Sequence, residues 1–288
     1  MRMKWLQPWL IRGGVVLLLA WSLLPILWAI RSSLTPAVDL TATTFSLLPP
    51  RFTLHHFDNL LGAVSIYHGQ AAQSVWPQFS RALLNSIVTS TAATLITVLI
   101  SAFGGYAFAR LRFPGRDMIF SLIVATLAIP AYTVMIPLYR MMVSVHLIDT
   151  YLGVTLVYVS AFLPLALWIM RSIYRGLPIA LEEAAALDGA GKLRTLFTIV
   201  MPMAGPGLMA AAILTFLNAW GQFLIPLVFS PTLATKPLTV LISEFVSKNY
   251  INYGLMNAAG ILAIIPPLLL VVFLNRYLIS GLTAGSGK

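Results

Sequence analysis

One segment of the sequence partly matches the motif that binds nucleotide phosphates. Residues Gly189-Ala190-Gly191-Lys192 match the end of a phosphate-binding loop. A complete loop needs an earlier glycine as well, and a hydroxyl residue directly after the lysine. Ala186 and Leu193 stand at those two positions. The sequence therefore predicts that this chain carries no ATP site of its own.

The other residue types that could do chemistry are not spaced for it. His55, His56 and His68 fall in one polar segment, but neighbouring histidines rarely converge on one ion. No carboxylate or thiol follows them at a spacing typical of metal sites. Serine, histidine and acidic residues also show no spacing typical of nucleophilic catalysis. We therefore expect no metal site, no catalytic residue and no enzymatic activity.

Residues 217–226 place two amides and an aromatic ring in a very apolar neighbourhood: Asn218, Trp220 and Gln222. An aromatic ring can stack on an apolar face of a ligand, and neutral amides bind hydroxyl groups without burying a charge. These three residues are therefore candidate contacts for a polar solute. The alternative is that they only pack against, and hydrogen-bond to, neighbouring helices.

The composition indicates an integral membrane protein. Hydrophobic residues make up 59% of the 288 residues and charged residues only 9%, and the mean hydropathy is +0.90. A soluble domain would have about a quarter of its residues charged. The net charge is +10, but the basic residues are scattered singly between apolar segments, which argues against a nucleic-acid partner. The absence of cysteine excludes disulfides and thiol ligands.

Six apolar segments are long enough to cross a bilayer as helices: residues 13–30, 81–109, 118–138, 151–173, 206–229 and 255–277. The first is too long for a typical signal peptide, so we expect an uncleaved span. Small and hydroxyl residues in the second span, with Gly104-Gly105 near its end, favour close helix packing. Pro130 and Pro137 should kink the third span. The predicted fold is all-α, a polytopic bundle of six transmembrane helices.

The basic residues predict the orientation of this bundle. With the N-terminus in the cytoplasm, six of the 18 lysines and arginines fall in outer segments: Arg31, Arg51, Arg81, Arg140, Lys236 and Lys248. The excess on the inner side agrees with the positive-inside rule and predicts that both termini are cytoplasmic. The outer segment 31–78 should contain a helix at 52–61, since a loop this long usually has structure of its own.

No predicted span carries a carboxylate near its centre. The acidic residues are Asp39, Asp58, Asp149 and Glu244 in outer segments, and Asp117, Glu182, Glu183 and Asp188 on the cytoplasmic side. Proton- and sodium-coupled carriers commonly have such groups inside the membrane, so we expect another protein to supply the driving force. The alternative is a self-contained secondary transporter or channel for a small polar solute, because carbonyls and hydroxyls also bind ions.

Residues 178–202 are the longest charged interruption in the second half of the chain. Pro178 suits the first turn of a helix, and Glu182 and Glu183 place negative charge near its positive N-terminal end. Gly189 can end this helix by taking a left-handed conformation. The pattern predicts a short polar helix that ends in a glycine elbow.

A second short helix should follow the elbow. Four apolar residues recur at helical spacing and predict one apolar face: Leu193, Leu196, Phe197 and Val200. Pro202 marks the expected end. The two helices and the glycine between them predict a compact element that projects from the bilayer between the fourth and fifth spans. Such an element suits a docking surface.

The spacing Glu183-Ala184-Ala185, Gly189, Ile199 and Pro202 resembles the cytoplasmic loop of permease subunits of binding-protein-dependent ABC importers. Met201 replaces the usual leucine of that pattern, which conserves volume. In that family the loop is the coupling element that sits in a cleft of a separate ATPase. The resemblance implies ATPase docking by eight residues of this chain: Glu182, Glu183, Ala184, Ala185, Asp188, Gly189, Ile199 and Pro202.

Residues 109–115, 217–226 and 280–285 also resemble segments of sugar-type, maltose/maltodextrin-type members of this family, with Gly221-Gln222 in place of the usual amide and acid. Relative to many permeases of that kind, residues 65–76 look like an insertion. The resemblance implies an N-terminal span and outer loop at 1–78, a permease transmembrane domain at 79–281 and a cytoplasmic tail at 282–288. It further implies a multi-pass subunit in a bacterial or archaeal inner membrane that imports an oligosaccharide or glycoside. Glycerol phosphate esters are the alternative substrates.

The same resemblance implies a heteromeric complex. Its members would be a second homologous permease, two ATP-binding subunits and an extracytoplasmic solute-binding protein, together with the sugar and the lipid bilayer. ATP and magnesium would bind in the partner subunits, and this chain would hold no cofactor.

Overall fold

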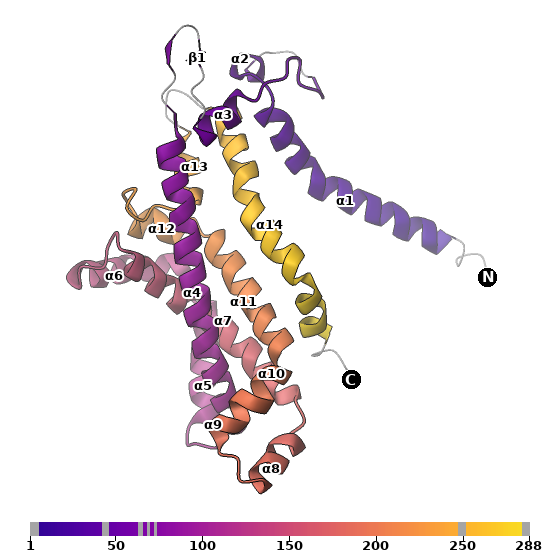
Figure 1. Ribbon diagram of the computed structural model, residues 1–288, viewed down its shortest axis with the longest axis vertical. Coiled ribbons are helices and arrows are strands. Elements are labelled where there is room, and N and C mark those ends of the chain that lie inside the picture. The colour runs from indigo at the N-terminus through magenta and orange to yellow at the C-terminus, as the bar shows by residue number, and fades with distance from the viewer. Residues whose placement is uncertain are drawn as a thin grey trace. The chain divides into compact units, whose positions relative to one another are not determined.

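The computed structural model describes residues 6–41, 46–62, 66–67, 70–71, 74–246 and 252–283, and most of these are helical (Figure 1). The chain folds as two compact units. One comprises Met1–Ser80 and Leu241–Ile265, and the other comprises Arg81–Val240 and Pro266–Lys288.

The first unit contains α1 (Leu6–Ser33), α2 (Ala37–Leu40), α3 (His55–Leu61), strands β1 (Ile66–Tyr67) and β2 (Gln70–Ala71), and parts of α4 (Trp76–Arg110), α13 (Leu238–Glu244) and α14 (Tyr253–Thr283). Large apolar side chains are exposed along α1, with Trp21 at 83% exposure. A bilayer would cover such a helix. β1 and β2 form an antiparallel hairpin within the predicted insertion 65–76. Several of its residues, including His68, lie outside the described residues.

Helix α3 is shorter than the predicted helix at 52–61 and is anchored by His56 and Leu60, which are both buried. His56 Nε2 lies 3.0 Å from the carbonyl oxygen of Thr35, to which it donates a hydrogen bond. Gly254 of α14 packs so closely that a Cβ atom there would lie 2.1 Å from His56 Nε2. The missing side chain at Gly254 therefore allows α14 to lie against α3.

The second unit contains most of α4, then α5 (Arg116–Ala125), η1 (Thr126–Ala128), α6 (Ala131–Ser144), α7 (Tyr151–Gly176), α8 (Ala180–Leu187), α9 (Lys192–Thr195), η2 (Leu196–Val200), α10 (Met201–Met203), α11 (Gly205–Trp220) and α12 (Leu224–Phe229). One buried apolar cluster joins α6, α7 and α12. A second joins the end of α4 to α7, η2 and the start of α11.

Glycines bring α4, α7 and α11 close together. A Cβ atom at Gly105 would lie 2.7 Å from Met170 Cβ, and one at Gly207 would lie 2.2 Å from Ile173 Cδ1. A side chain at Gly105 would push against the backbone of α7, and one at Gly207 would displace the side chain of Ile173. The prediction that small residues near the end of the second span serve helix packing is confirmed.

The predicted all-α membrane bundle is confirmed. Four described helices are long and apolar enough to cross a membrane: Ile11–Ser33, Trp76–Arg110, Tyr151–Gly176 and Tyr253–Leu274. Two pairs of helices that bend sharply raise the number of candidate spans to as many as 6. The second, fourth and sixth predicted spans match α4, α7 and α14, with ends that extend by a few residues.

Two predicted spans are interrupted. The third was expected as one kinked helix, but α5 and α6 are joined through η1 with a bend of 104°. Pro130 has an extended backbone directly before α6, and it cannot donate the hydrogen bond that would continue a helix. The fifth was expected at 206–229, but α11 ends at Trp220 and α12 begins at Leu224. Its break is stabilised by Gln222 Oε1, which accepts hydrogen bonds from the N–H groups of Phe223 (3.1 Å) and Leu224 (3.2 Å).

Candidate functional site

The segment from α8 to α10 is the predicted docking element, and α8 forms its first helix. Pro178 precedes this helix rather than lying in its first turn, because Ile179 is the residue at its N-cap. Glu182 and Glu183 do lie in the first turn, near the positive end of the helix dipole. Gly189 has φ +82°, so the left-handed elbow predicted from the sequence is confirmed.

The elbow is closed by backbone hydrogen bonds. Gly189 N donates to Ala186 O at 3.1 Å, and Ala190 N donates to Ala185 O at 2.9 Å. These bonds satisfy carbonyl groups that the end of α8 would otherwise leave without partners. A Cβ atom at Gly189 would meet no atom within 4 Å, so the glycine is required by its backbone conformation and not by crowding.

The second helix of this element differs from its predicted face. Leu196 and Val200 are buried as expected, but Leu193 is 68% exposed and Phe197 is 53% exposed. Leu193 lies in α9, before the π-helix Leu196–Val200, and Phe197 packs on Phe103 of α4 with ring centroids 5.7 Å apart. Pro202 does not end the helix either. It lies in α10, and the chain bends by 75° only after Met203, where α11 begins.

Glu182 is bound inside the second unit. Arg110 Nε donates to Glu182 Oε1 at 2.6 Å, and the hydroxyl of Tyr106 donates to Oε2 at 3.1 Å. Arg110 Nη2 also donates to the carbonyl oxygen of Leu177 at 2.7 Å. The side chains of Arg110 and Glu182 are only 11% and 13% exposed. We call these four residues the Arg110 clasp, and it joins the end of α4 to the first turn of α8.

Sequence reasoning identified Glu182 but missed Arg110, Tyr106 and Leu177. Only the contact between α4 and α8 could reveal these partners. The burial of Glu182 in the clasp makes it a positioning residue for α8, because both of its carboxylate oxygens have partners within the chain.

Glu183 has the opposite environment, although it is the next residue. Its side chain is exposed and makes no hydrogen bond or ion pair within the part of the chain that the structure describes. Two leucines near the elbow are also exposed, Leu187 at 90% and Leu193 at 68%. Exposed apolar side chains with a polar group at their rim are typical of a protein interface. Leu187 and Leu193 were not among the predicted docking residues.

The remaining predicted docking residues occupy different positions. Ala184, Asp188 and Pro202 are exposed, Ile199 is partly buried and Ala185 is buried at 7% exposure. A cavity of about 380 Å³ lies where the end of α4 faces α8 and α9, and its lining includes Arg110, Arg112, Glu183, Ala186 and Lys192. Its lining carries both charges, from Arg110 and Lys192 and from Glu182 and Glu183, and could accept a polar side chain from a partner.

The three predicted substrate contacts lie at the break between α11 and α12. Asn218 is exposed, but its amide donates to Leu214 O of its own helix at 2.7 Å. Trp220 is 7% exposed and stacks on Phe216 with ring centroids 5.6 Å apart. Gln222 caps α12, as described above. Packing and capping therefore account for Trp220 and Gln222, and Asn218 has the most exposed side chain of the three.

A second cavity was not expected from the sequence. It has a volume of about 350 Å³, lies at the break of the third span, and is bounded by residues of η1, α6, α7 and α12. Its lining is mainly apolar, with hydroxyl groups from Thr126 and Ser160. None of the three predicted substrate contacts lies among its lining residues. In the sequence, Pro130 indicated the break in the third span at which this cavity lies.

No group of three His, Asp or Glu side chains that could hold a metal ion occurs among the residues that the structure describes.

Known proteins are similar to this chain in sequence and in fold. Residues 101–283 match the model of the family described as binding-protein-dependent transport system inner membrane component. The chain is 33% identical to the trehalose transport system permease protein SugB of Mycobacterium tuberculosis, over 94% of each protein. It is 31% identical to the trehalose/maltose transport system permease protein MalG of Thermococcus litoralis, over 100% of this chain and 99% of that one.

Among solved structures, the fold is similar to that of a chain in a bacterial ABC transporter involved in the import of the acidic polysaccharide alginate. The TM-score is 0.78 with 21% sequence identity, and the match covers 96% of this chain and 99% of that one.

Proposed function

This chain belongs to the family of inner membrane components of binding-protein-dependent transport systems, and we propose that it is the permease subunit of an ATP-driven importer of a sugar or glycoside. The observation that carries the proposal is the segment from α8 to α10. In it Gly189 forms a left-handed elbow after α7, which is long and apolar enough to cross a membrane, and before the bent pair Lys192–Met203 and Gly205–Trp220. The sugar assignment is supported by similar permeases that are named for trehalose and for trehalose and maltose.

The α8–α10 segment is the proposed coupling site. Glu183, Leu187 and Leu193 would contact the ATPase, because their side chains are exposed around the elbow. ATP and magnesium would bind in that separate subunit, since the phosphate-loop pattern of this chain is incomplete at Ala186 and Leu193. This chain would take no catalytic part in hydrolysis.

The proposed complex contains this permease, a second homologous permease, two ATPase subunits and an extracytoplasmic binding protein that delivers the solute. Both termini and the α8–α10 segment would face the cytoplasm. The excess of lysine and arginine on that side supports this orientation. Closure of the ATPase pair would move α8, and the connected helices would then open the pathway to alternate sides.

The direct test is reconstituted transport. With the binding protein and the ATPase subunits present, liposomes that contain this chain should take up radiolabelled trehalose or maltose only when ATP is supplied on the ATPase side. Uptake by the purified chain alone would overturn the proposal and favour a secondary transporter or channel. The ligand of the co-purified binding protein tests the substrate class, because a bound glycerol phosphate ester would contradict the sugar assignment.

The orientation can be tested separately because the chain has no cysteine. A single cysteine introduced at Ala190, in the elbow, should react with a membrane-impermeant maleimide only after the membrane is opened. Labelling of intact cells from outside would contradict the cytoplasmic placement of the elbow.

A further inference from the structure

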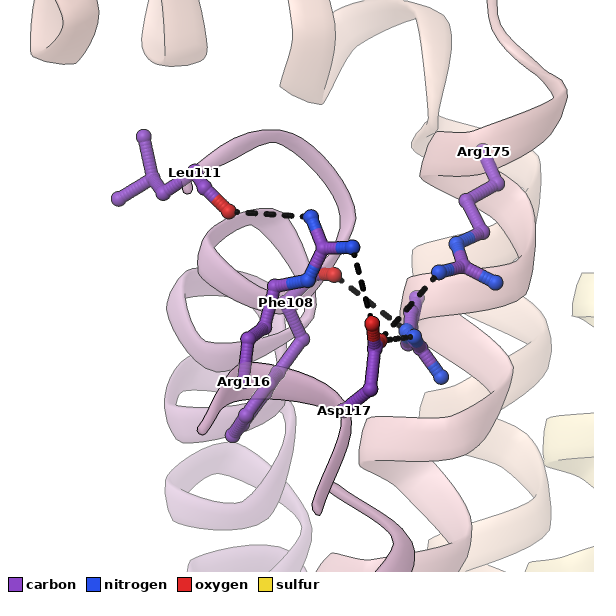
Figure 2. Close-up of polar contacts among 6 residues, drawn as sticks. Phe108, Leu111, Arg116, Asp117 and Arg175 are labelled. Atoms are coloured by element: carbon purple, nitrogen blue, oxygen red, sulfur yellow. Dashed lines mark hydrogen bonds and ion pairs between the residues drawn. The ribbon is translucent and has the colours of Figure 1, made fainter. Parts of the chain in front are cut away.

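Three arginines form ion pairs with one carboxylate where α5 begins and α7 ends: Arg116, Arg171 and Arg175 with Asp117. A fourth, Arg112, lines the same cavity as Arg116 and Asp117. We call these five residues the Asp117 patch. Asp117 Oδ1 lies 2.6 Å from Arg171 Nη2 and 3.8 Å from Arg175 Nη2, while Oδ2 lies 3.2 Å from Arg116 Nη2. Figure 2 shows Arg116 and Arg175 on either side of this carboxylate.

Two of the four guanidinium groups are held in place by the fold. Arg116 Nη1 donates to Leu111 O at 3.2 Å, a contact drawn in Figure 2. Arg171 Nε donates to Phe108 O at 3.3 Å, and its guanidinium lies 3.8 Å from the centroid of the Phe120 ring. Because these contacts fix the two groups before any ligand arrives, little side-chain freedom is left to be lost on binding.

The charges of the patch do not balance. The two carboxylate oxygens of Asp117 form ion pairs with three arginines. Arg112 is exposed and has no ion-pair partner within the described ranges. Four positive groups and one negative group leave an excess positive charge of three. An anion with several oxygens would relieve this repulsion. The planar forks of arginine match the oxygens of a phosphate better than those of a single carboxylate.

The patch opens into a cavity that continues onto an apolar surface. The cavity has a volume of about 490 Å³ and is lined by Arg112, Phe113, Gly115, Arg116, Asp117 and Met118. The residues that follow on α5 are apolar and exposed, with Met118 at 69%, Ile119 at 44% and Leu122 at 57%. α5 is also half of one of the two bent helix pairs that could cross the membrane.

We propose that the Asp117 patch binds the phosphate headgroup of an anionic phospholipid in the cytoplasmic leaflet, with an acyl chain of that lipid along α5. The inference rests on the orientation given under the proposed function, which places the α4–α5 turn on the cytoplasmic side. A cationic pocket next to an exposed apolar helix matches an amphiphile. A soluble acidic protein would match only the charged half of this surface.

The test uses the full chain, purified together with its partner subunits in mild detergent. Native mass spectrometry would compare the retention of phosphatidylglycerol with that of phosphatidylcholine with the same acyl chains. The double variant Arg112→Gln and Arg175→Gln removes the two most exposed charges and keeps Arg116 and Arg171, which bond to the backbone. Each basic residue near an anionic surface contributes roughly a factor of five, so the retention of phosphatidylglycerol should fall about 30-fold.

The matched control is the double variant Arg81→Gln and Arg140→Gln, which removes two exposed arginines from segments expected on the outer side. It should retain phosphatidylglycerol like the wild type. Equal retention of the two lipids by the wild type, or equal loss in both variants, would overturn the proposal. Loss of the ATPase from the patch variant with unchanged lipid retention would overturn it too and identify a protein contact. Competition by soluble glycerol phosphate as strong as that by the lipid would show a site for free phosphate esters.

Sugar uptake by the same preparation distinguishes this proposal from the proposed function. Selective retention of phosphatidylglycerol without ATP-dependent uptake would contradict the importer and support the lipid site. ATP-dependent uptake without selective retention of phosphatidylglycerol would support the importer and contradict the lipid site.

Discussion

Removal of the Glu182 carboxylate should release α8 from the end of α4. The Glu182→Ala variant leaves Arg110 with Leu177 O as its remaining partner and takes the acceptor from the Tyr106 hydroxyl. Exposed ion pairs contribute about 0–1 kcal/mol, and breaking a fully buried pair costs about 3–5 kcal/mol. The two side chains are 11% and 13% exposed, so we expect a cost near the lower end of the buried range, about 3 kcal/mol.

A helix of 8 residues cannot keep its structure without tertiary contacts, so this loss should appear as local opening. A cost of about 3 kcal/mol corresponds to an open population that is about 100-fold larger. Hydrogen–deuterium exchange of the α8 amides should therefore become about 100-fold faster, with little change in the amides of α11. In the reconstituted importer, ATP hydrolysis should continue while sugar uptake falls.

Glu183→Ala is the matched control. It removes the same residue type from the same helical turn, but its side chain is exposed and makes no bond among the described residues. Exchange in α8 should change by less than about threefold in this variant. A second control replaces the whole pair, Arg110→Met with Glu182→Met, and should recover most of the protection because an apolar pair can replace a buried ion pair. Equal exchange in the Glu182→Ala and Glu183→Ala variants would refute the structural role of the clasp.

Three further predictions concern single positions. Gly189→Val should destabilise the elbow by about 1–2 kcal/mol, because φ +82° is unfavourable for a β-branched residue although the site is open. The variant should therefore hydrolyse ATP without sugar uptake, and wild-type coupling would contradict this. Gly254→Ala should lower the unfolding temperature, because its Cβ would lie 2.1 Å from His56 Nε2. The control Gly260→Ala should be neutral or stabilising, because its Cβ would meet no atom within 4 Å. Equal changes of the unfolding temperature in both variants would count against the α3–α14 contact. Burial lowers the pKa of His56 below its ordinary value of 6.5. The contribution of the neutral ring to stability is therefore present above pH 6.5 and is lost as the pH falls through the lowered pKa. The wild type should lose more thermal stability between pH 7 and pH 5 than His56→Gln, and identical pH profiles would refute this.

The membrane spans and the elbow could be predicted because each depends on local signals. Apolar length fixes where a helix can cross the membrane, and a glycine that follows a short polar helix marks a left-handed end. Pro130 marked the correct place in the third span, but not the size of the bend. A proline shows only that a hydrogen bond is missing, and the packing of α5 and α6 decides how far the axis turns.

The contacts that position the candidate site could not be predicted in the same way. Arg110 and Glu182 are 72 residues apart, and neither position has a spacing that indicates a partner. Helical spacing also placed four apolar residues of the second helix on one face, but it could not show that Leu196 and Val200 are buried while Leu193 and Phe197 are exposed. Glu182 and Glu183 look equivalent in sequence, and only the position of α4 makes one a positioning residue and the other an exposed one.

The position of α8 depends on two kinds of contact, and they connect it to different helices. The Arg110 clasp joins its first turn to α4. Beyond the elbow, Leu196 and Val200 lie in the apolar cluster that contains Met170 of α7 and Ala211 of α11. The polar contact fixes a direction, because hydrogen bonds require a defined geometry, whereas the apolar cluster permits small shifts. If a partner displaces the elbow, the movement would therefore reach α4 through the clasp, and α7 and α11 through the apolar cluster. Loss of the clasp should then impair coupling while the packing of the helical bundle is kept.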